Sequence, residues 1–219
     1  MTTGETIEQI WAGILSRMKR RPMADFSKAF PELEMVEGGH VDDSNDRGGE
    51  TYKGIARKIF PGWDGWKIVD GAKKSAGTKE ELESILTSDG KLQWLVAEFY
   101  KKTFWDIHRL DEFTSQRVAS EVFEIGVNCG SGTAAKFLQR VLNALNRQER
   151  DWPDIPVDGK IGPKTVEMAN RASIKREANI EIFLNVLQGG RYMELAERDD
   201  RYGESFINGW ANRIRIRKV

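Results

Sequence analysis

Glu37 and the loop that follows it carry the residues best suited to acid-catalysed hydrolysis. Glu37 ends an apolar helical pattern, seven residues after Phe30 and four after Leu33, and Gly38 and Gly39 stop that pattern. A carboxyl on an apolar face at the negative end of a helix dipole is harder to ionise, so we expect a raised pKa for Glu37. A carboxyl that stays protonated near neutral pH can act as the general acid that cleaves a glycosidic bond.

Two further polar residues could position the water that attacks the sugar. Asp46 follows Glu37 by nine residues and Thr51 follows Asp46 by five, in a stretch dense in Gly, Asp and Asn. An inverting glycosidase holds its carboxyl groups roughly 6.5–9.5 Å apart so that water fits between them, and a retaining enzyme about 5 Å apart. We expect the longer separation between Glu37 and Asp46. A Gly- and Asp-rich loop after a helix is as often a plain turn, so the pattern alone leaves both interpretations open.

Helical spacing of apolar residues dominates the chain, and no long strand is evident. The stretch 38–54 predicts turns and at most one short irregular hairpin. Asp89 is a typical N-cap, and the helix that it would begin carries an apolar stripe of Trp94, Leu95 and Phe99, which predicts core packing. Further helical patterns cover residues 5–18, 25–37, 52–60, 79–86, 115–127, 132–142, 163 onward, 176–198 and 203–216.

These patterns predict a mainly α chain with a short irregular β or loop segment. We expect an added N-terminal helix within residues 1–24, one domain over residues 25–114 and a second, helical domain over residues 115–219. The stretch 146–163, rich in Pro and Gly, predicts a loop, and Pro163 predicts the start of the helix that follows it.

Composition excludes several classes of protein. The 34 basic and 34 acidic residues give zero net charge, so no overall field would steer the chain onto nucleic acid or an anionic membrane. Cys129 is the only cysteine, so no internal disulfide can form. No apolar run reaches the length of a membrane span, and the N-terminus lacks the order of a signal peptide. We therefore expect a monomer, made in the cytoplasm and without stable membrane insertion.

The first half of the chain resembles a known family of enzymes. Glu37-Gly38-Gly39, followed by the stretch 45–55 (NDRGGETYKGI), is similar to the N-terminal signature of the glycoside hydrolase 108 muramidases. The resemblance implies that Glu37 is the catalytic acid, as the glutamate of that family's EGGY motif is. His40 replaces the tyrosine of the motif, and we expect His40 and Tyr52 to contact substrate. The order Glu37, Asp46, Thr51 also resembles that of phage-type lysozymes.

The second half resembles the peptidoglycan-binding domain that accompanies this family. The resemblance is carried by four segments, and the whole match spans roughly residues 26–215: FEIGVNCG (123–130), AAKFLQ (134–139), VDGKIGPKT (157–165) and GWANR (209–213). Most of the third segment predicts a structural turn. Asn128 and Gln139 are the better candidates for polar contacts with wall peptide or sugar.

The resemblance implies a lysozyme-like catalytic domain that hydrolyses the β-1,4 bond between N-acetylmuramic acid and N-acetylglucosamine in peptidoglycan glycan strands, with no cofactor. It fits a phage endolysin that passes the membrane through a holin. It equally fits a bacterial enzyme that remodels the wall during secretion, and both would act in the periplasm or cell wall. The alternative is a non-catalytic peptidoglycan-binding protein whose first half has lost activity.

Other hydrolase chemistries fit the sequence poorly. A zinc peptidase or amidase needs several His or Cys ligands, and the chain offers only His40, His108 and Cys129, without HExxH or CxxC. We expect His108 to be a structural histidine with its hydrogen bonds satisfied, and Cys129 to be a buried thiol rather than a nucleophile. A calcium loop starting at Asp42 places Lys53 where a glutamate ligand is required. No metal site is therefore predicted.

Overall fold

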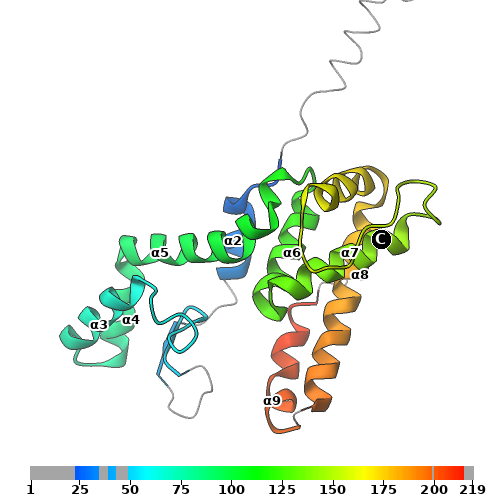
Figure 1. Cartoon of the computed structure of the whole chain (residues 1–219). Coiled ribbons are helices and arrows are strands. Elements are labelled where there is room, and N and C mark those ends of the chain that lie inside the picture. The colour runs from blue at the N-terminus through cyan, green and yellow to red at the C-terminus, as the bar shows by residue number, and fades with distance from the viewer. Residues whose placement is uncertain (1–22, 35–38, 43–48, 199, 215–219) are drawn as a thin grey trace, which may run out of the picture.

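A computed structural model describes residues 23–34, 39–42, 49–198 and 200–214 of the chain. Helices dominate these residues, and one small antiparallel sheet of three strands accompanies them (Figure 1). The predicted mainly α fold with a short β segment is confirmed. The elements are α2 (Phe26–Glu34), β1 (His40–Val41), β2 (Thr51–Tyr52), β3 (Ile55–Ala56), α3 (Gly65–Ser75), α4 (Lys79–Ser88), α5 (Gly90–Tyr100), η1 (Lys101–Trp105), η2 (Asp106–His108), η3 (Leu110–Glu112), α6 (Gln116–Cys129), α7 (Ser131–Leu145), α8 (Pro163–Arg198) and α9 (Asp200–Ala211).

Local capping signals mark several helix starts. The Asp89 carboxylate accepts the Leu92 N–H at 2.8 Å and begins α5, as predicted. Pro163 begins α8, also as predicted. Within α8, Arg176 has non-helical backbone angles (φ −134°, ψ 23°), which explains why the sequence pattern divides there into two helices. The expected core position of Trp94 is wrong, because 58% of its side chain is exposed.

The predicted helix over residues 52–60 is wrong. This stretch contains β2 and β3, joined by Lys53 and Gly54 in left-handed conformations (φ 44° and 76°). A left-handed pair reverses the chain, and glycine enters that region at no steric cost. The sequence pattern also failed to predict α3, because Gly65 and Gly71 are typical of a loop.

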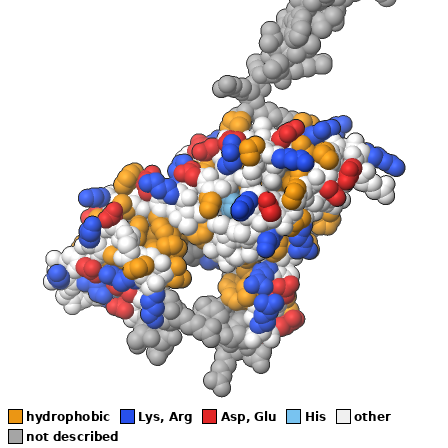
Figure 2. All heavy atoms as spheres, in the orientation of Figure 1, with side chains coloured by type: hydrophobic (Ala, Val, Ile, Leu, Met, Phe, Trp, Pro, Cys, Tyr) orange, Lys and Arg blue, Asp and Glu red, His pale blue; other side chains and the backbone are white. Residues whose placement is uncertain are grey.

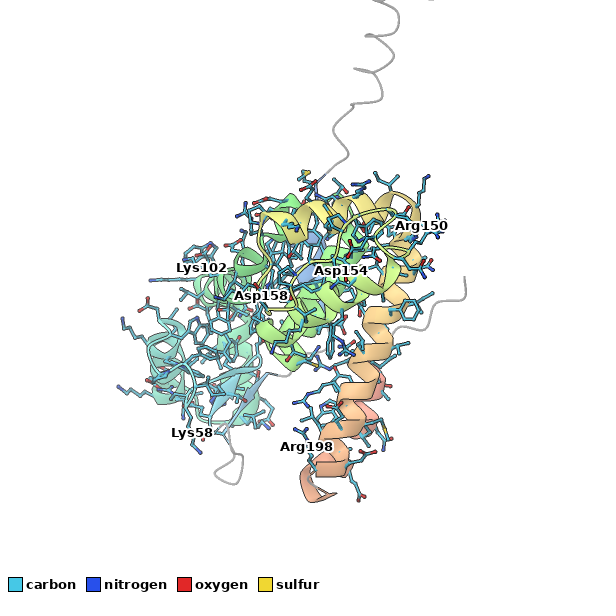
Figure 3. The ribbon with its side chains drawn as sticks, turned by 45° about the vertical axis from the view of Figure 1, so that its right-hand side comes forward. Lys58, Lys102, Arg150, Asp154, Asp158 and Arg198 are labelled. Carbon is cyan, nitrogen blue, oxygen red and sulfur yellow. The ribbon has the colours of Figure 1, made fainter. Side chains whose placement is uncertain are left out.

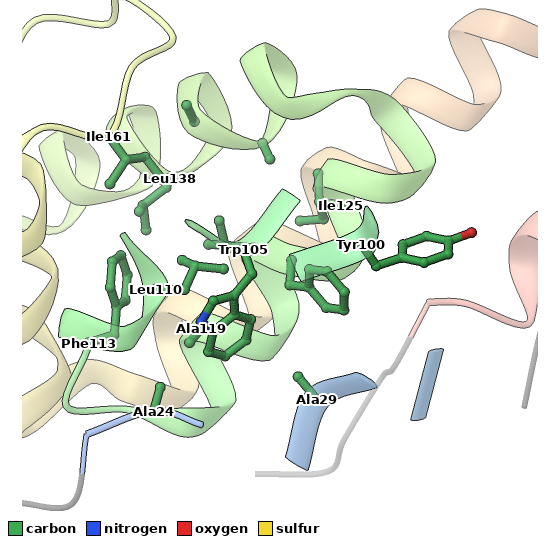
Figure 4. Close-up of a cluster of buried hydrophobic side chains, with 14 of the residues drawn as sticks. Ala24, Ala29, Tyr100, Trp105, Leu110, Phe113, Ala119, Ile125, Leu138 and Ile161 are labelled. Atoms are coloured by element: carbon green, nitrogen blue, oxygen red, sulfur yellow. The ribbon is translucent and has the colours of Figure 1, made fainter. Parts of the chain in front are cut away.

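One continuous apolar core joins the two halves of the chain (Figure 4). Three aromatic rings meet at its centre, from α2, η1 and α6. Phe26 lies 5.7 Å from Trp105 and 5.6 Å from Phe123, and the latter two rings are 5.7 Å apart, all in edge-to-face geometry. Figure 1 shows α3 and α4 gathered at one end of α5, with α6, α7 and α8 packed together at the other end.

The surface bears both signs of charge. Basic and acidic side chains are interspersed over the face in Figure 2, and the whole chain has zero net charge. Among the described residues, no helix combines the length and the apolar character that crossing a membrane demands.

Candidate active site

The small sheet brings three of the predicted site residues together, His40, Thr51 and Tyr52. In the β1–β2 pair, His40 lies opposite Tyr52 and Val41 lies opposite Thr51. The Thr51 side chain is partly exposed. Glu37 and Asp46 lie outside the described residues; α2 and β1 bracket Glu37 in the sequence, and β1 and β2 bracket Asp46. The described part of the site therefore consists of residues that precede and follow these two positions in the sequence.

His40 is held from two sides. Its backbone N–H donates to Glu83 Oε1 of α4 at 2.6 Å, and its Nε2 lies 2.8 Å from Glu50 Oε1. Only 7% of the residue is exposed. Gly39 lies against the same carboxylate, because a Cβ at this position would come 2.4 Å from Glu83 Oε2. Glu83 therefore holds the start of β1, and a side chain at Gly39 would have to displace the Glu83 carboxylate.

Glu50 is the centre of an ionic network. Besides His40, it contacts Arg57 Nε at 2.6 Å and Lys73 Nζ at 2.9 Å. Burial opposes ionisation of Glu50, but the hydrogen bonds from His40 and Lys73 outweigh it and hold the pKa of Glu50 below its ordinary value. Arg57 continues the network to Asp70, with nitrogen–oxygen distances of 2.6 and 3.1 Å. We call these residues, together with Asp42, the Glu50 network.

Lys73 closes the network across the loop. Its ammonium group lies 3.0 Å from Asp42 Oδ2 as well as 2.9 Å from Glu50 Oε1. The hydrogen bonds that Lys73 donates to these two carboxylates raise its pKa, so the cation persists through the neutral range. Asp42 immediately precedes residues 43–48, and Glu50 follows them. One side chain of α3 therefore ties together both ends of the segment that contains Asp46.

Tyr52 anchors the sheet through its buried side chain. Its side chain is 1% exposed, its hydroxyl accepts from Gln93 Nε2 at 2.9 Å, and its ring stacks on Trp63. The next residue is held by the same glutamine, because Lys53 Nζ donates to Gln93 Oε1 at 2.7 Å. These contacts anchor β2 and leave Tyr52 without an exposed face for sugar.

Comparisons with known proteins identify this half of the chain. Residues 30–130 match the family model described as Glycosyl hydrolase 108. The first half belongs to the glycosyl hydrolase 108 family. Residues 133–215 match a second model, described as Predicted Peptidoglycan domain. The family and its companion domain, both predicted from the sequence, are confirmed, and the chain is a glycoside hydrolase that acts on peptidoglycan.

A solved structure shares this fold. The structure of Brucella abortus SagA aligns over 86% of this chain and 88% of its own, with 24% sequence identity and a TM-score of 0.54. A search of curated proteins gave no match. The domain boundary expected near residue 114 stays a prediction, because α6 packs against α2 as well as α7.

In the peptidoglycan domain, Gln139 holds a turn. Its Nε2 donates to Asp158 Oδ1 at 2.8 Å and to the Lys160 carbonyl at 2.9 Å, while its Oε1 accepts the Gly159 N–H at 3.0 Å. Only 1% of Gln139 is exposed. Asn128, at the end of α6, similarly donates to the Glu124 carbonyl at 2.9 Å and accepts from Arg213. Both amides serve the fold in this structure, so their roles in wall binding stay predictions.

Of the two groups considered for rival chemistries, His108 is buried and Cys129 is half-buried. Burial raises the pKa of the Cys129 thiol to about 11, which keeps it protonated and makes it a poor nucleophile. His108 is 2% exposed, and its ring nitrogens have no hydrogen-bond partner among the described residues, so the expectation of satisfied hydrogen bonds is wrong. Within those residues, no cluster of three or more His, Cys, Asp or Glu could hold a metal ion.

Sequence reasoning missed most of the Glu50 network. Glu50 lies inside the quoted NDRGGETYKGI motif, so its position in the motif was the available signal. Arg57 lies just beyond the motif. Lys73 and Glu83 come from α3 and α4, where a charged residue on a helix usually indicates only a solvated face. Their contacts with the glycosyl hydrolase 108 sheet depend on tertiary packing.

Proposed function

We propose that this enzyme is a muramidase that hydrolyses the β-1,4 bond between N-acetylmuramic acid and N-acetylglucosamine, with Glu37 as the general acid. The observation that carries the proposal is the match of residues 30–130, which contain Glu37, to the glycosyl hydrolase 108 family. The apolar helical pattern that precedes Glu37 favours its protonated form. Glu37 then donates its proton to the glycosidic oxygen as the bond to the anomeric carbon breaks.

Asp46 and Thr51 position the water that attacks the anomeric carbon from the opposite face, so the product has inverted configuration. Two features of the described residues support this role. Thr51 presents a partly exposed hydroxyl from β2. Lys73 holds both ends of the segment that carries Asp46, through Asp42 and Glu50. Catalytic groups need this kind of positioning, because small displacements cost large factors in rate.

The test is the substitution Glu37→Gln, which keeps the shape of the side chain and removes its proton. General acid catalysis contributes roughly 10²–10⁴-fold, so we expect clearance of purified sacculi to slow by at least about 100-fold. Glu80→Gln is the matched control, since Glu80 is exposed in the first turn of α4. If Glu37→Gln clears sacculi as fast as the parent, Glu37 is not the acid. If neither protein clears them, a non-catalytic peptidoglycan-binding protein becomes the better description.

A further inference from the structure

A basic pocket lies in the peptidoglycan domain, between the loop that follows α7 and the first half of α8. Its volume is about 320 Å³. Five cationic side chains and a single carboxylate line it: Arg147, Arg150, Arg171, Lys175, Arg176 and Asp151. In a chain of zero net charge, this is a marked local excess of positive charge. Such an excess favours an anionic ligand.

The one carboxylate is already engaged. Asp151 accepts a hydrogen bond from Arg176, and that bond lowers the pKa of Asp151; Arg147 lies 3.9 Å away. Within the described part of the chain, Arg150, Arg171 and Lys175 form no ion pair, and all three are exposed. Three cations of the pocket are therefore available to a ligand.

The backbone around the pocket is irregular and firmly held. Arg147, Gln148 and Glu149 are three consecutive left-handed residues, with φ of 57°, 60° and 61°. This conformation costs roughly 1–2 kcal/mol per residue outside glycine. Asn146, only 3% exposed, supports it by accepting the Glu149 N–H at 3.2 Å and donating to Asp154 at 2.6 Å. Strain of this kind is retained where the surroundings enforce it, and it is frequent at ligand sites.

The second wall of the pocket is built at the irregular point of α8. The Arg176 guanidinium lies 5.2 Å from the centre of the Trp152 ring, whose indole N–H donates to the Leu142 carbonyl at 3.1 Å. Trp152 is buried, whereas Ile174 is 58% exposed and gives the pocket an apolar edge. The cationic side chains of the pocket therefore lie beside the buried, hydrogen-bonded Trp152 and one exposed apolar side chain, Ile174.

The pocket is remote from the candidate active site. Figure 3 shows Arg150 at the opposite end of the molecule from Lys58, which follows β3 in the glycosyl hydrolase 108 domain. A polymer could occupy both places at once. Two linked contacts raise the apparent affinity well above that of either alone.

We propose that this pocket binds the carboxylates of peptidoglycan stem peptides, as a second contact with the polymer away from the cleaved bond. The proposal rests on peptidoglycan being the substrate, as the proposed function states. Guanidinium groups match carboxylates with paired hydrogen bonds, and four of the five cations that line the pocket are arginines. Exposed Ile174 suits the aliphatic side chains of such peptides better than it suits a phosphate polymer.

The test removes two available cations with Arg171→Gln plus Lys175→Gln. The matched control is Lys164→Gln plus Arg198→Gln, which removes the same charge from exposed positions of α8 outside the pocket. All variants carry Glu37→Gln, so that binding is measured without cleavage. The ligands are a soluble stem peptide, the same peptide with amidated carboxylates, and sacculi with and without removal of phosphate polymers. Thermal unfolding confirms that each variant is folded.

We expect the pocket variant to bind the free stem peptide roughly tenfold more weakly than the control variant, since charge-assisted contacts are lost. We also expect the amidated peptide to bind both variants equally weakly. Equal binding of the free peptide to the two variants overturns the proposal. So does a loss confined to sacculi that retain phosphate polymers, which would assign the pocket to phosphate. A failure of Glu37 as the acid leaves these binding results interpretable, because they do not depend on hydrolysis.

Discussion

The ammonium group of Lys73 lies 2.9 Å from Glu50 Oε1, and through this contact α3 holds the start of β2. The same ammonium reaches Asp42 at 3.0 Å, on the other side of residues 43–48. We therefore expect Lys73 to have a positioning role in catalysis, because it holds the segment that carries Asp46. Glu50 is only 11% exposed, so its charge depends on its cationic partners.

Replacing Lys73 with methionine tests this positioning role. We expect Lys73→Met to lower kcat on sacculi by about tenfold or more with little change in KM, because a misplaced catalytic group costs rate more than binding. The free energy of unfolding should fall by only about 1 kcal/mol, as for a partly exposed ion pair. Lys74→Met, at the exposed neighbouring position, is the control. Equal kcat values for the two variants would show that Lys73 does not position the catalytic segment.

The pH dependence of stability tests the burial of His108. Burial lowers its pKa from 6.5 to about 4, so the unfolded chain binds a proton more readily than the folded one below pH 6.5. Stability is therefore complete above pH 6.5 and is lost as pH falls towards 4. The loss amounts to about 3 kcal/mol at most.

Urea unfolding at a series of pH values measures this effect, with His108→Leu as the comparison. The variant has no group to titrate at this position, so its stability should decline less between pH 6.5 and 4. The Glu50 carboxyl, whose pKa is lowered, adds a loss in both proteins only as pH falls through its ordinary value of 4.5 and below. Parallel pH profiles above pH 5 would show that His108 is not the cause.

The aromatic cluster predicts how strongly α2 is tied to the rest of the molecule. Phe123 is 1% exposed and contacts both Phe26 and Trp105, so Phe123→Ala should cost about 3–5 kcal/mol. The matched control is Phe183→Ala on α8, where 45% exposure predicts a change within roughly 0.5 kcal/mol. Denaturant midpoints at constant m-value give both numbers. A small effect at Phe123 would mean that the core between α2 and α6 is loosely packed.

The sequence predicted the elements whose signals are local. The Asp89 cap, the Pro163 helix start and the division of α8 at Arg176 all depend on nearby residues. The error over residues 52–60 has a tertiary cause, since the left-handed turn at Lys53 is held by the Tyr100 hydroxyl, which donates to its carbonyl at 2.7 Å. The helical spacing of residues 52–60 gave no indication of that contact.

The same distinction applies to the candidate site. Motif resemblance supplied Glu37, Asp46 and Thr51, because they lie close together in the chain. Lys73 and Glu83 contact Glu50 and His40 from helices 23 and 43 residues further on. Residues that position a site from such distances leave no pattern in a single sequence, and only packing identifies them.

Mass spectrometry of the ends released from purified sacculi tests the central claim most directly. We expect new reducing ends on N-acetylmuramic acid from the parent enzyme, and almost none from Glu37→Gln under the same conditions. Reducing ends on N-acetylglucosamine, or free peptides without new sugar ends, would contradict it, as would muramic acid ends formed equally fast by the variant.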